Sequence, residues 1–196
     1  MKTTLSLTLS LVSAAALAGC ASNRGNTASV PATVGPATAT MSAAPAATSA
    51  ARLADQQFVA VAAGSGMYEV EASRVALTRA SDAQVRAYAQ MLVHHHTANN
   101  GELMALVSAK GHRVVPGLPA PLQQKVNILS GLSGPAFDRE FIRTTGVADH
   151  MAAINAFEQN RRTVAHRDLQ AYIDRTLPVL RTHLQQAQDL AGRMAG

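Results

Sequence analysis

The fold is decided by one stretch, Gln90-Met-Leu-Val-His-His-His-Thr-Ala-Asn-Asn-Gly-Glu-Leu-Met-Ala-Leu-Val107. Residues three and four positions apart lie on the same face of an α-helix. In and just before this stretch, one face collects mostly apolar side chains, and a histidine stands where a leucine is expected. The face consists of Val85, Ala89, Leu92, His96, Asn99, Leu103 and Leu106. The pattern predicts a long amphipathic helix with an inward histidine.

The three adjacent histidines must face different directions, because successive residues are about 100° apart around a helix. We expect His96 to point into the protein, His95 to lie at the edge of the apolar face and His94 to point away. A single inward histidine is compatible with a hydrogen-bonded core residue or with a ligand. The choice depends on whether other helices present polar residues at the same depth.

Composition favours one modest helical domain with appendages. The chain has 196 residues, and only 4% of them are aromatic, so the core must be built mainly from Leu, Val, Ala and Met. Such a core suits close-packed helices better than a sheet. The formal charge is +5, but Arg161-Arg162 is the longest run of adjacent Lys or Arg residues. This pattern predicts a solvated surface and no nucleic-acid interface.

Residues 1–19 read as a signal peptide, with Lys2 before an apolar segment from Leu5 to Leu17 that is too short for an ordinary membrane span. The segment ends in Leu17-Ala18-Gly19-Cys20, which resembles the bacterial lipobox. The resemblance implies that Cys20 becomes the lipidated first residue of the mature protein. Cys20 is also the only cysteine, and a free thiol in an oxidising compartment is the less favoured alternative. We expect acyl chains on Cys20 to anchor the protein to a membrane without spanning it.

The residue after the cysteine and the segment that follows it suggest where the domain lies. Ala21 follows Cys20, and in a lipoprotein of the enterobacterial type this implies the outer membrane, with the domain facing the periplasm.

Residues 20–51 are mostly Ala, Thr, Ser, Pro and Gly. Such a segment buries too little apolar surface to offset its ordering entropy, so we predict a disordered tether. Residues 52–196 would form the folded domain.

Four long helices are expected in that domain, and apolar spacing and capping signals give their limits. The first two are joined by a short link with Ser81-Asp82 as N-cap, so they should be antiparallel neighbours. Gly111 is expected to end the second helix. The predicted ranges are about Leu53 or Asp55 to Arg79, Asp82 to Lys110, Pro135 to Val164, and Asp168 to Ala191.

Prolines shape the rest of the predicted architecture. Pro116, Pro119 and Pro121 mark a long crossover, in which residues 122–132 could form a short helix. Pro178 lies inside the last helical pattern and predicts a kink near residues 174–176. The predicted fold is therefore all-α: an antiparallel four-helix bundle with a long crossover carrying a short helix between helices 2 and 3.

Each predicted helix contributes one inward polar residue: Glu69, His96, His150 and His183. With a rise of 1.5 Å per residue, His150 and His183 both lie roughly 25 Å from the turn near residue 166. Glu69 and His96 lie about 17 and 23 Å from the turn near residue 80, and they lean toward each other because helical side chains tilt toward the N-terminus. The four residues are therefore predicted to meet in one layer.

The segment from Asp55 to Leu190 resembles the DUF4142 domain, a ferritin-like bundle of bacterial envelope proteins. The motifs are Asp55-x-x-Phe58-Val59, Met67-x-Glu69-Val70-Glu71, Ala89-Gln90-x-Leu92-Val93-x-x-His96, Gly134-x-x-Phe137-Asp138, Asp149-His150 and Thr176-Leu177-Pro178-x-Leu180-x-x-His183. The resemblance implies a ferritin-like fold but no established biochemical activity. Where the family typically reads Asp-Asp-His before a threonine, this chain reads His94-His95-His96.

Two interpretations of the polar layer stay open. In the first, the layer hydrogen-bonds internally, and the domain is a structural or binding module. In the second, Glu69, His96, His150 and His183 bind a divalent transition metal, with a redox role as one use of it, and the set suits zinc, copper, nickel or mononuclear iron. Di-iron bundles use Glu-x-x-His, which this chain lacks. A metal site requires imidazole nitrogens that converge to about 4 Å or less.

Enzymatic activity is the less favoured expectation. The sequence contains no nucleophile elbow, no P-loop and no dinucleotide-binding glycine motif after a strand. No catalytic residue is therefore assigned.

Overall fold

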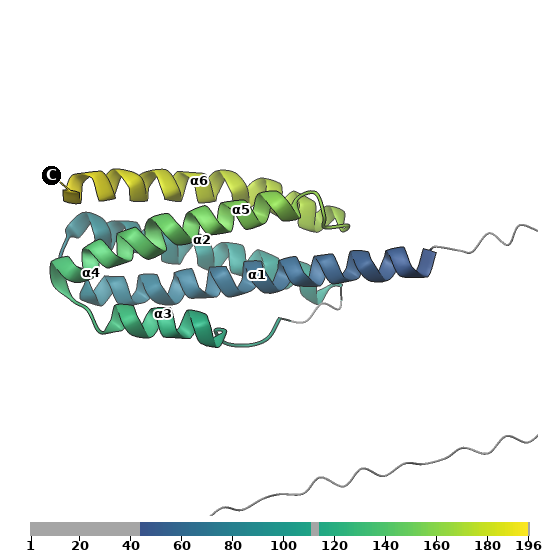
Figure 1. Cartoon of the computed structure of the whole chain (residues 1–196), viewed down its shortest axis with the longest axis horizontal. Helices are drawn as coiled ribbons and strands as arrows, with labels where there is room; N and C mark the ends of the chain where they lie inside the picture. Colours follow the sequence, from purple (N-terminus) through teal and green to yellow (C-terminus); the bar gives the residue numbers. More distant parts are fainter. Residues whose placement is uncertain (1–43, 111–113, 196) are drawn as a thin grey trace, which may run out of the picture. The chain divides into compact units, whose positions relative to one another are not determined.

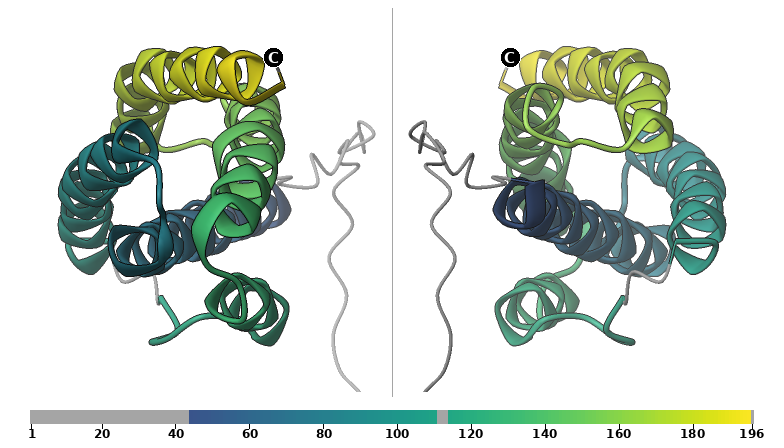
Figure 2. Two further views of the ribbon diagram at one scale, coloured as in Figure 1. Left: turned by 90° about the vertical axis from the view of Figure 1, so that its left-hand side faces the viewer. Right: turned by 90° about the vertical axis from the view of Figure 1, so that its right-hand side faces the viewer.

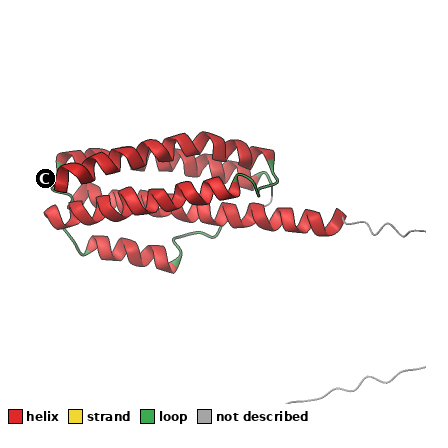
Figure 3. Cartoon of the chain, turned by 45° about the horizontal axis from the view of Figure 1, so that its top comes forward, coloured by secondary structure: helices red, strands yellow, loops and turns green. Residues whose placement is uncertain are grey.

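The structure, a computed structural model, describes residues 44–110 and 114–195. Within these ranges the chain forms helices joined by loops and turns and contains no strand (Figure 3). The all-α prediction is confirmed. The expected signal peptide, Cys20 and most of the expected tether lie outside the described residues, as does Gly111. No helix of the described part is long and apolar enough to cross a membrane.

The first two helices, α1 (Ala44–Arg79) and α2 (Ala83–Ser108), pack along each other. Asp82 caps α2 as predicted, since its carboxylate accepts the backbone N–H groups of Gln84 and Val85 at 2.6 and 3.1 Å. α1 begins well before the predicted start near Leu53 and takes in residues 44–51, which composition places in the tether. These residues are rich in alanine, the best helix former, and a proline in the first turn is tolerated.

The crossover carries α3 (Ala120–Ser130), close to the predicted short helix. Pro119 occupies the N-cap position and Pro121 lies in the first turn, where a missing N–H leaves no bond unmade. The helix packs against α1 and lies outside the group of longer helices (Figure 2). It does not contribute to the polar layer.

The third helical stretch has three parts: α4 (Gly134–Phe141), the π-helix η1 (Ile142–Asp149) and α5 (His150–Asn160). The prediction of one continuous helix to Val164 is wrong in this respect. A π-helix has wider, i to i+5 turns, which rotate the following residues away from regular α-helical spacing. Met151, one residue after the inward His150, is 54% exposed, whereas Ala153 is buried.

The last helix, α6 (Arg167–Ala195), continues through Pro178. All seven residues of its predicted inward face are buried: Leu169, Ile173, Thr176, Leu180, His183, Ala187 and Leu190. Asp168 is not the N-cap, because α6 begins one residue earlier. Its backbone N–H instead bonds Nδ1 of His166 at 3.2 Å, and its carboxylate pairs with Lys110 at 2.9 Å.

The longer helices form a closed ring of contacts. α1 packs against α2 and α5, and α6 packs against α5 and α2 (Figure 1). Inside this ring the apolar side chains form two clusters. One includes Tyr88, Leu92 and Phe141, and the other includes Phe58 and Leu103. On α2 and α6 the inward histidine falls, in sequence, between the part that joins one cluster and the part that joins the other.

Two buried carboxylates hold turns between helices. Asp138 on α4 accepts the backbone N–H groups of Ser81 and Asp82, each at 3.0 Å, and so holds the α1–α2 turn. Asp55 accepts the N–H of Ala165 at 2.8 Å and so ties α1 to the turn before α6. Both acids belong to the sequence motifs quoted above, and both accept hydrogen bonds from backbone N–H groups of turns.

Two glycines permit close helix contacts near the polar layer. A Cβ atom at Gly146 would lie 2.9 Å from the Cβ of Ala187, so η1 and α6 approach closely there. A Cβ atom at Gly66 would lie 2.0 Å from Oδ1 of Asn100. Since α1 is helical throughout this region, Gly66 serves close packing and not a break in the helix.

Candidate metal centre

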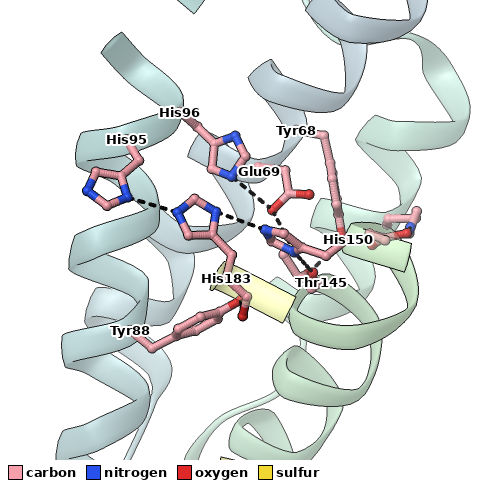
Figure 4. Close-up of polar contacts among 10 residues, drawn as sticks. Tyr68, Glu69, Tyr88, His95, His96, Thr145, His150 and His183 are labelled. Carbon is pink, nitrogen blue, oxygen red and sulfur yellow. Dashed lines mark hydrogen bonds and ion pairs between the residues drawn. The ribbon is translucent and has the colours of Figure 1, made fainter. Parts of the chain in front are cut away.

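Four inward side chains meet between the two apolar clusters (Figure 4). They come from different helices: Glu69 from α1, His96 from α2, His150 from the start of α5 and His183 from α6. Glu69, His150 and His183 are 0% exposed and His96 is 4% exposed. The structure therefore brings together the four residues singled out by helical spacing.

The three histidines approach one another, but at a wider spacing than the limit of about 4 Å expected of a metal site. One ring nitrogen from each of His96, His150 and His183 can be chosen so that all lie within 4.8 Å of one another. Nε2 of His150 and Nδ1 of His183 are 3.2 Å apart. One tetrahedral ion requires nitrogens about 3.3 Å apart for bonds of about 2.0 Å, so the His150–His183 pair has this spacing and His96 would have to move closer.

Glu69 lies beside this triangle. Its Oε2 atom is 3.6 Å from Nε2 of His96 and 3.6 Å from Nδ1 of His150. Both distances exceed those of normal hydrogen bonds. Glu69 thus approaches the Nδ1 side of His150, while the Nε2 side of that ring faces His183.

The orientation of His150 is set by the π-helix. Its Nδ1–H donates to the backbone carbonyl of Thr145 at 2.9 Å, and Thr145 lies in η1, five residues earlier. A carbonyl oxygen can only accept, so neutral His150 carries its proton on Nδ1 and presents the Nε2 lone pair to the cluster. A partner that holds the distal nitrogen in this way is typical of metal-binding histidines.

His95 is a neighbour of the site that sequence reasoning placed only at the edge of the apolar face. Its ring is half-buried and stacks on that of His183, with centroids 5.1 Å apart and planes 13° apart. Nδ1 of His95 and Nε2 of His183 form a hydrogen bond of 2.8 Å. His94 is exposed, as expected.

Two tyrosines near the layer were also missed by sequence reasoning. The Tyr88 hydroxyl donates to the backbone carbonyl of His183 at 3.2 Å, and the Tyr68 hydroxyl bonds Oγ1 of Thr145 at 2.8 Å. Both therefore brace the backbone segments that carry the histidines (Figure 4). Their positions next to apolar residues gave no signal of this role.

Glu69 differs from the other buried carboxylates of the described residues. Asp55 and Asp138 accept hydrogen bonds from backbone N–H groups, whereas neither oxygen of Glu69 has a hydrogen-bond partner there. The same holds for Nε2 of His96, which faces it. Buried polar atoms are nearly always partnered, and a buried acid without a donor is destabilising.

Burial controls the protonation of the layer. It raises the pKa of Glu69 well above the ordinary value, and the nearby Asp149 carboxylate raises it further. Burial lowers the pKa of His96 and His150, and it lowers that of His183 to about 3. Near neutral pH the metal-free layer therefore holds neutral imidazoles, and burial disfavours the ionised form of Glu69. Neutral imidazole is the form that coordinates metals.

Comparison with known families supports the resemblance seen in the motifs. A family model described as "Domain of unknown function (DUF4142)" matches residues 38–190. No curated protein and no solved structure matches the chain. The family match includes all four residues of the polar layer.

Proposed function

The chain belongs to the DUF4142 family, and from this premise we propose that its helical domain binds one divalent transition-metal ion through His96, His150 and His183. Glu69 is proposed as the fourth ligand through its approach to Nε2 of His96, and its carboxylate would have to move from the Nδ1 side of His150 to reach the ion. The family description assigns no activity, so the proposal rests on the polar layer alone. We propose a binding domain and not an enzyme, because all four candidate ligands are buried side chains and leave no position for a substrate.

One observation carries the proposal: both oxygens of Glu69 and Nε2 of His96 are buried and lack hydrogen-bond partners among the described residues. A bound cation would satisfy these atoms together. It would also stabilise the ionised form of Glu69, which burial alone disfavours. No other group of three or more His, Cys, Asp or Glu side chains in the described part of the chain has metal-binding geometry.

The donor set indicates the kind of ion. Three imidazoles and one carboxylate suit zinc, copper, nickel or a mononuclear iron ion. A carboxylate-bridged di-iron pair needs Glu-x-x-His on two helices, and Val93 and Val147 stand three residues before His96 and His150. We therefore propose a mononuclear site and use Zn²⁺ as the probe.

The second candidate is a structural or binding module whose polar layer fixes the packing of the helices. It is favoured by the hydrogen bonds that link His150, His183 and His95 without any ion. A polar layer stabilises a unique core when all its members are satisfied. The unpartnered atoms of Glu69 and His96 make this candidate the weaker one.

We further propose that the domain is a ferritin-like antiparallel four-helix bundle. In this view α1, α2, the stretch from α4 through α5, and α6 are the four helices, and α3 belongs to the crossover. The ring of contacts among these helices supports the arrangement. The short α1–α2 link and the short α5–α6 link make each pair antiparallel.

We also propose that the domain is attached to the outer membrane and faces the periplasm. The support is the sequence: a signal peptide over residues 1–19, a lipobox ending at Cys20 and a tether before α1. No ligand of the proposed centre is a thiol, so the site does not depend on the state of the only cysteine. An oxidising compartment would leave the histidines unchanged.

Elemental analysis and calorimetric Zn²⁺ titration of the chain without its signal peptide test the metal proposal. The protein must carry no affinity tag that binds metals. We expect one ion per chain, with binding lost in His96→Leu and retained in His94→Ala, because His94 is exposed on the same helix. Absence of binding by Zn²⁺, Cu²⁺, Ni²⁺ and Fe²⁺ at neutral pH would leave only the structural candidate.

A further inference from the structure

We infer that His95 is a positioning residue of the proposed centre, because it determines which nitrogen of His183 carries the proton and thus whether His183 can coordinate an ion. The inference rests on the metal-binding function proposed above. His95 itself does not touch the ion. It acts through its 2.8 Å hydrogen bond to Nε2 of His183 (Figure 4).

One backbone carbonyl orders the protons of three rings. The carbonyl of Thr145 requires the proton of His150 to be on Nδ1, so Nε2 of His150 can only accept. The 3.2 Å contact with Nδ1 of His183 then requires the proton of His183 to be on Nδ1. Nε2 of His183 is therefore an acceptor, and neutral His95 must donate to it from Nδ1.

In this arrangement His183 cannot bind metal. The nitrogen that faces the cluster, Nδ1, carries the proton, and the nitrogen with a free lone pair, Nε2, accepts from His95. His150 needs no change, because its Nε2 lone pair already faces the cluster. His183 is thus the one candidate ligand whose proton position, fixed by hydrogen bonds, opposes coordination.

Coordination by His183 therefore requires a change of tautomer in two rings. His183 releases its Nδ1 proton to water and takes the Nδ1 proton of His95 onto Nε2, while His95 takes a proton from water onto its own Nε2. The number of protons on the two rings is unchanged. In the metal-bound state Nε2–H of His183 donates to Nδ1 of His95, which is the arrangement that commonly holds a metal-binding histidine in place.

Substitutions at His95 separate this role from packing. His95→Asp supplies a group that can only accept, so it should favour the metal-binding tautomer of His183, whereas His95→Leu supplies no acceptor. We expect His95→Leu to weaken Zn²⁺ binding by about 10- to 100-fold. His94→Asp is the matched control for added negative charge, because His94 is the exposed neighbour on the same helix.

The expected order of Zn²⁺ affinity is His95→Asp above His94→Asp, and His95→Leu well below wild type. Nitrogen-15 NMR of the imidazole rings provides the readout that a purely structural role would not change. Wild-type His183 should have its proton on Nδ1 without metal and on Nε2 with Zn²⁺. His150 should keep its proton on Nδ1 in both states.

The two proposals fail in different ways. If wild type binds no Zn²⁺, the metal function is wrong, and the positioning role falls with it. If wild type binds Zn²⁺ but His95→Leu binds equally well, or if metal-free His183 already has its proton on Nε2, only the role of His95 is overturned. Equal affinity of His95→Asp and His94→Asp would likewise show that charge, and not the acceptor, is responsible.

Discussion

Oε2 of Glu69 lies 3.6 Å from Nε2 of His96, and neither atom has a hydrogen-bond partner among the described residues. A glutamate and a histidine in water would form an ion pair at such a contact. Here burial raises the pKa of Glu69 and lowers that of His96, so it disfavours the charged form of both groups. A cation of charge +2 beside Glu69 would lower the pKa of this side chain, because the positive charge stabilises the ionised carboxylate.

Metal binding should therefore release the proton that the raised pKa of Glu69 retains. The pKa of Glu69 is raised well above 4.5 by burial, and an ion can bind the side chain as a carboxylate only after that proton leaves. Calorimetry of Zn²⁺ binding in buffers of different ionisation enthalpy measures the number of protons released. Glu69→Gln should release none and should bind about 10- to 100-fold more weakly, as expected for the loss of one charged partner. Equal proton release by wild type and Glu69→Gln would show that Glu69 is not the source.

The stability of the metal-free domain should be greatest near pH 6.5. A histidine with a lowered folded-state pKa stabilises fully above its ordinary value of 6.5, and this contribution is lost as the pH falls, for His183 toward about 3. A carboxyl with a raised pKa acts in the opposite direction, so the contribution of Glu69 is present below 4.5 and is lost as the pH rises. Between pH 4.5 and 6.5, the stability gained from His96, His150 and His183 as the pH rises exceeds the stability lost from Glu69.

Urea unfolding of the metal-free chain from pH 4.5 to 8.5 measures this profile. Glu69→Gln should remove the contribution that falls as the pH rises from 4.5, and so steepen the gain in stability on the acid side. His183→Leu should reduce the acid-side slope by about 1.4 kcal/mol per pH unit, which corresponds to one proton. A wild-type profile without a slope on the acid side would contradict the buried, neutral state of the histidines.

The contact between η1 and α6 should tolerate no added methyl group. Gly146→Ala would place a Cβ atom 2.9 Å from the Cβ of Ala187, so two backbones must separate, and we expect a loss of about 1 to 3 kcal/mol. Gly101→Ala is the matched control, since nothing lies within 4 Å of its Cβ position in α2. It should stabilise by about 0.5 to 1 kcal/mol. Thermal unfolding compares the two, and equal effects would contradict the close approach.

Helical spacing predicted the members of the polar layer because their depth depends only on a constant rise along each helix. Glu69, His96, His150 and His183 were identified in this way, and the exposure of His94 follows from the same 100° rotation. The turn at Asp82 was predictable because an N-cap uses local hydrogen bonds. These features need no knowledge of which helix packs on which.

Other features depend on contacts between distant parts of the chain. The π-helix η1 has no local signal, and Met151, which follows it, is exposed. The partner of His95 could not be predicted, because it depends on how α2 packs against α6. The start of α1 was misplaced, since alanine-rich composition is compatible with a tether or with an extended helix.

Cys20→Ser should release the protein from membranes. The sequence Leu17 to Cys20 predicts lipidation at the thiol, and without acyl chains no other anchor is proposed. Labelling of cells with a fatty-acid analogue, followed by membrane fractionation, tests both consequences. Ser22→Ala is the control and should keep the label. Unchanged membrane association of Cys20→Ser would exclude the lipid anchor proposed here.

Replacing the inward histidines by leucine should separate metal binding from packing. Each side chain occupies a position between apolar clusters, so leucine fits the surroundings. His96→Leu removes a ring whose Nε2 has no hydrogen-bond partner, and the metal-free variant should be as stable as wild type or more stable. His183→Leu leaves His150 and His95 without their ring partner, so it should cost about 1 to 3 kcal/mol.

Both variants should lose the metal-dependent increase in Tm. An ion that binds only the folded chain stabilises it by RT ln(1 + [L]/Kd), which is about 2.7 kcal/mol at a hundredfold excess over Kd. His94→Ala should keep the wild-type Tm in the absence of metal and the full increase with Zn²⁺. If His96→Leu keeps the increase, the ligand set is wrong. If no divalent metal raises the Tm of the untagged wild type at neutral pH, where the imidazoles are free to coordinate, the layer is a structural one.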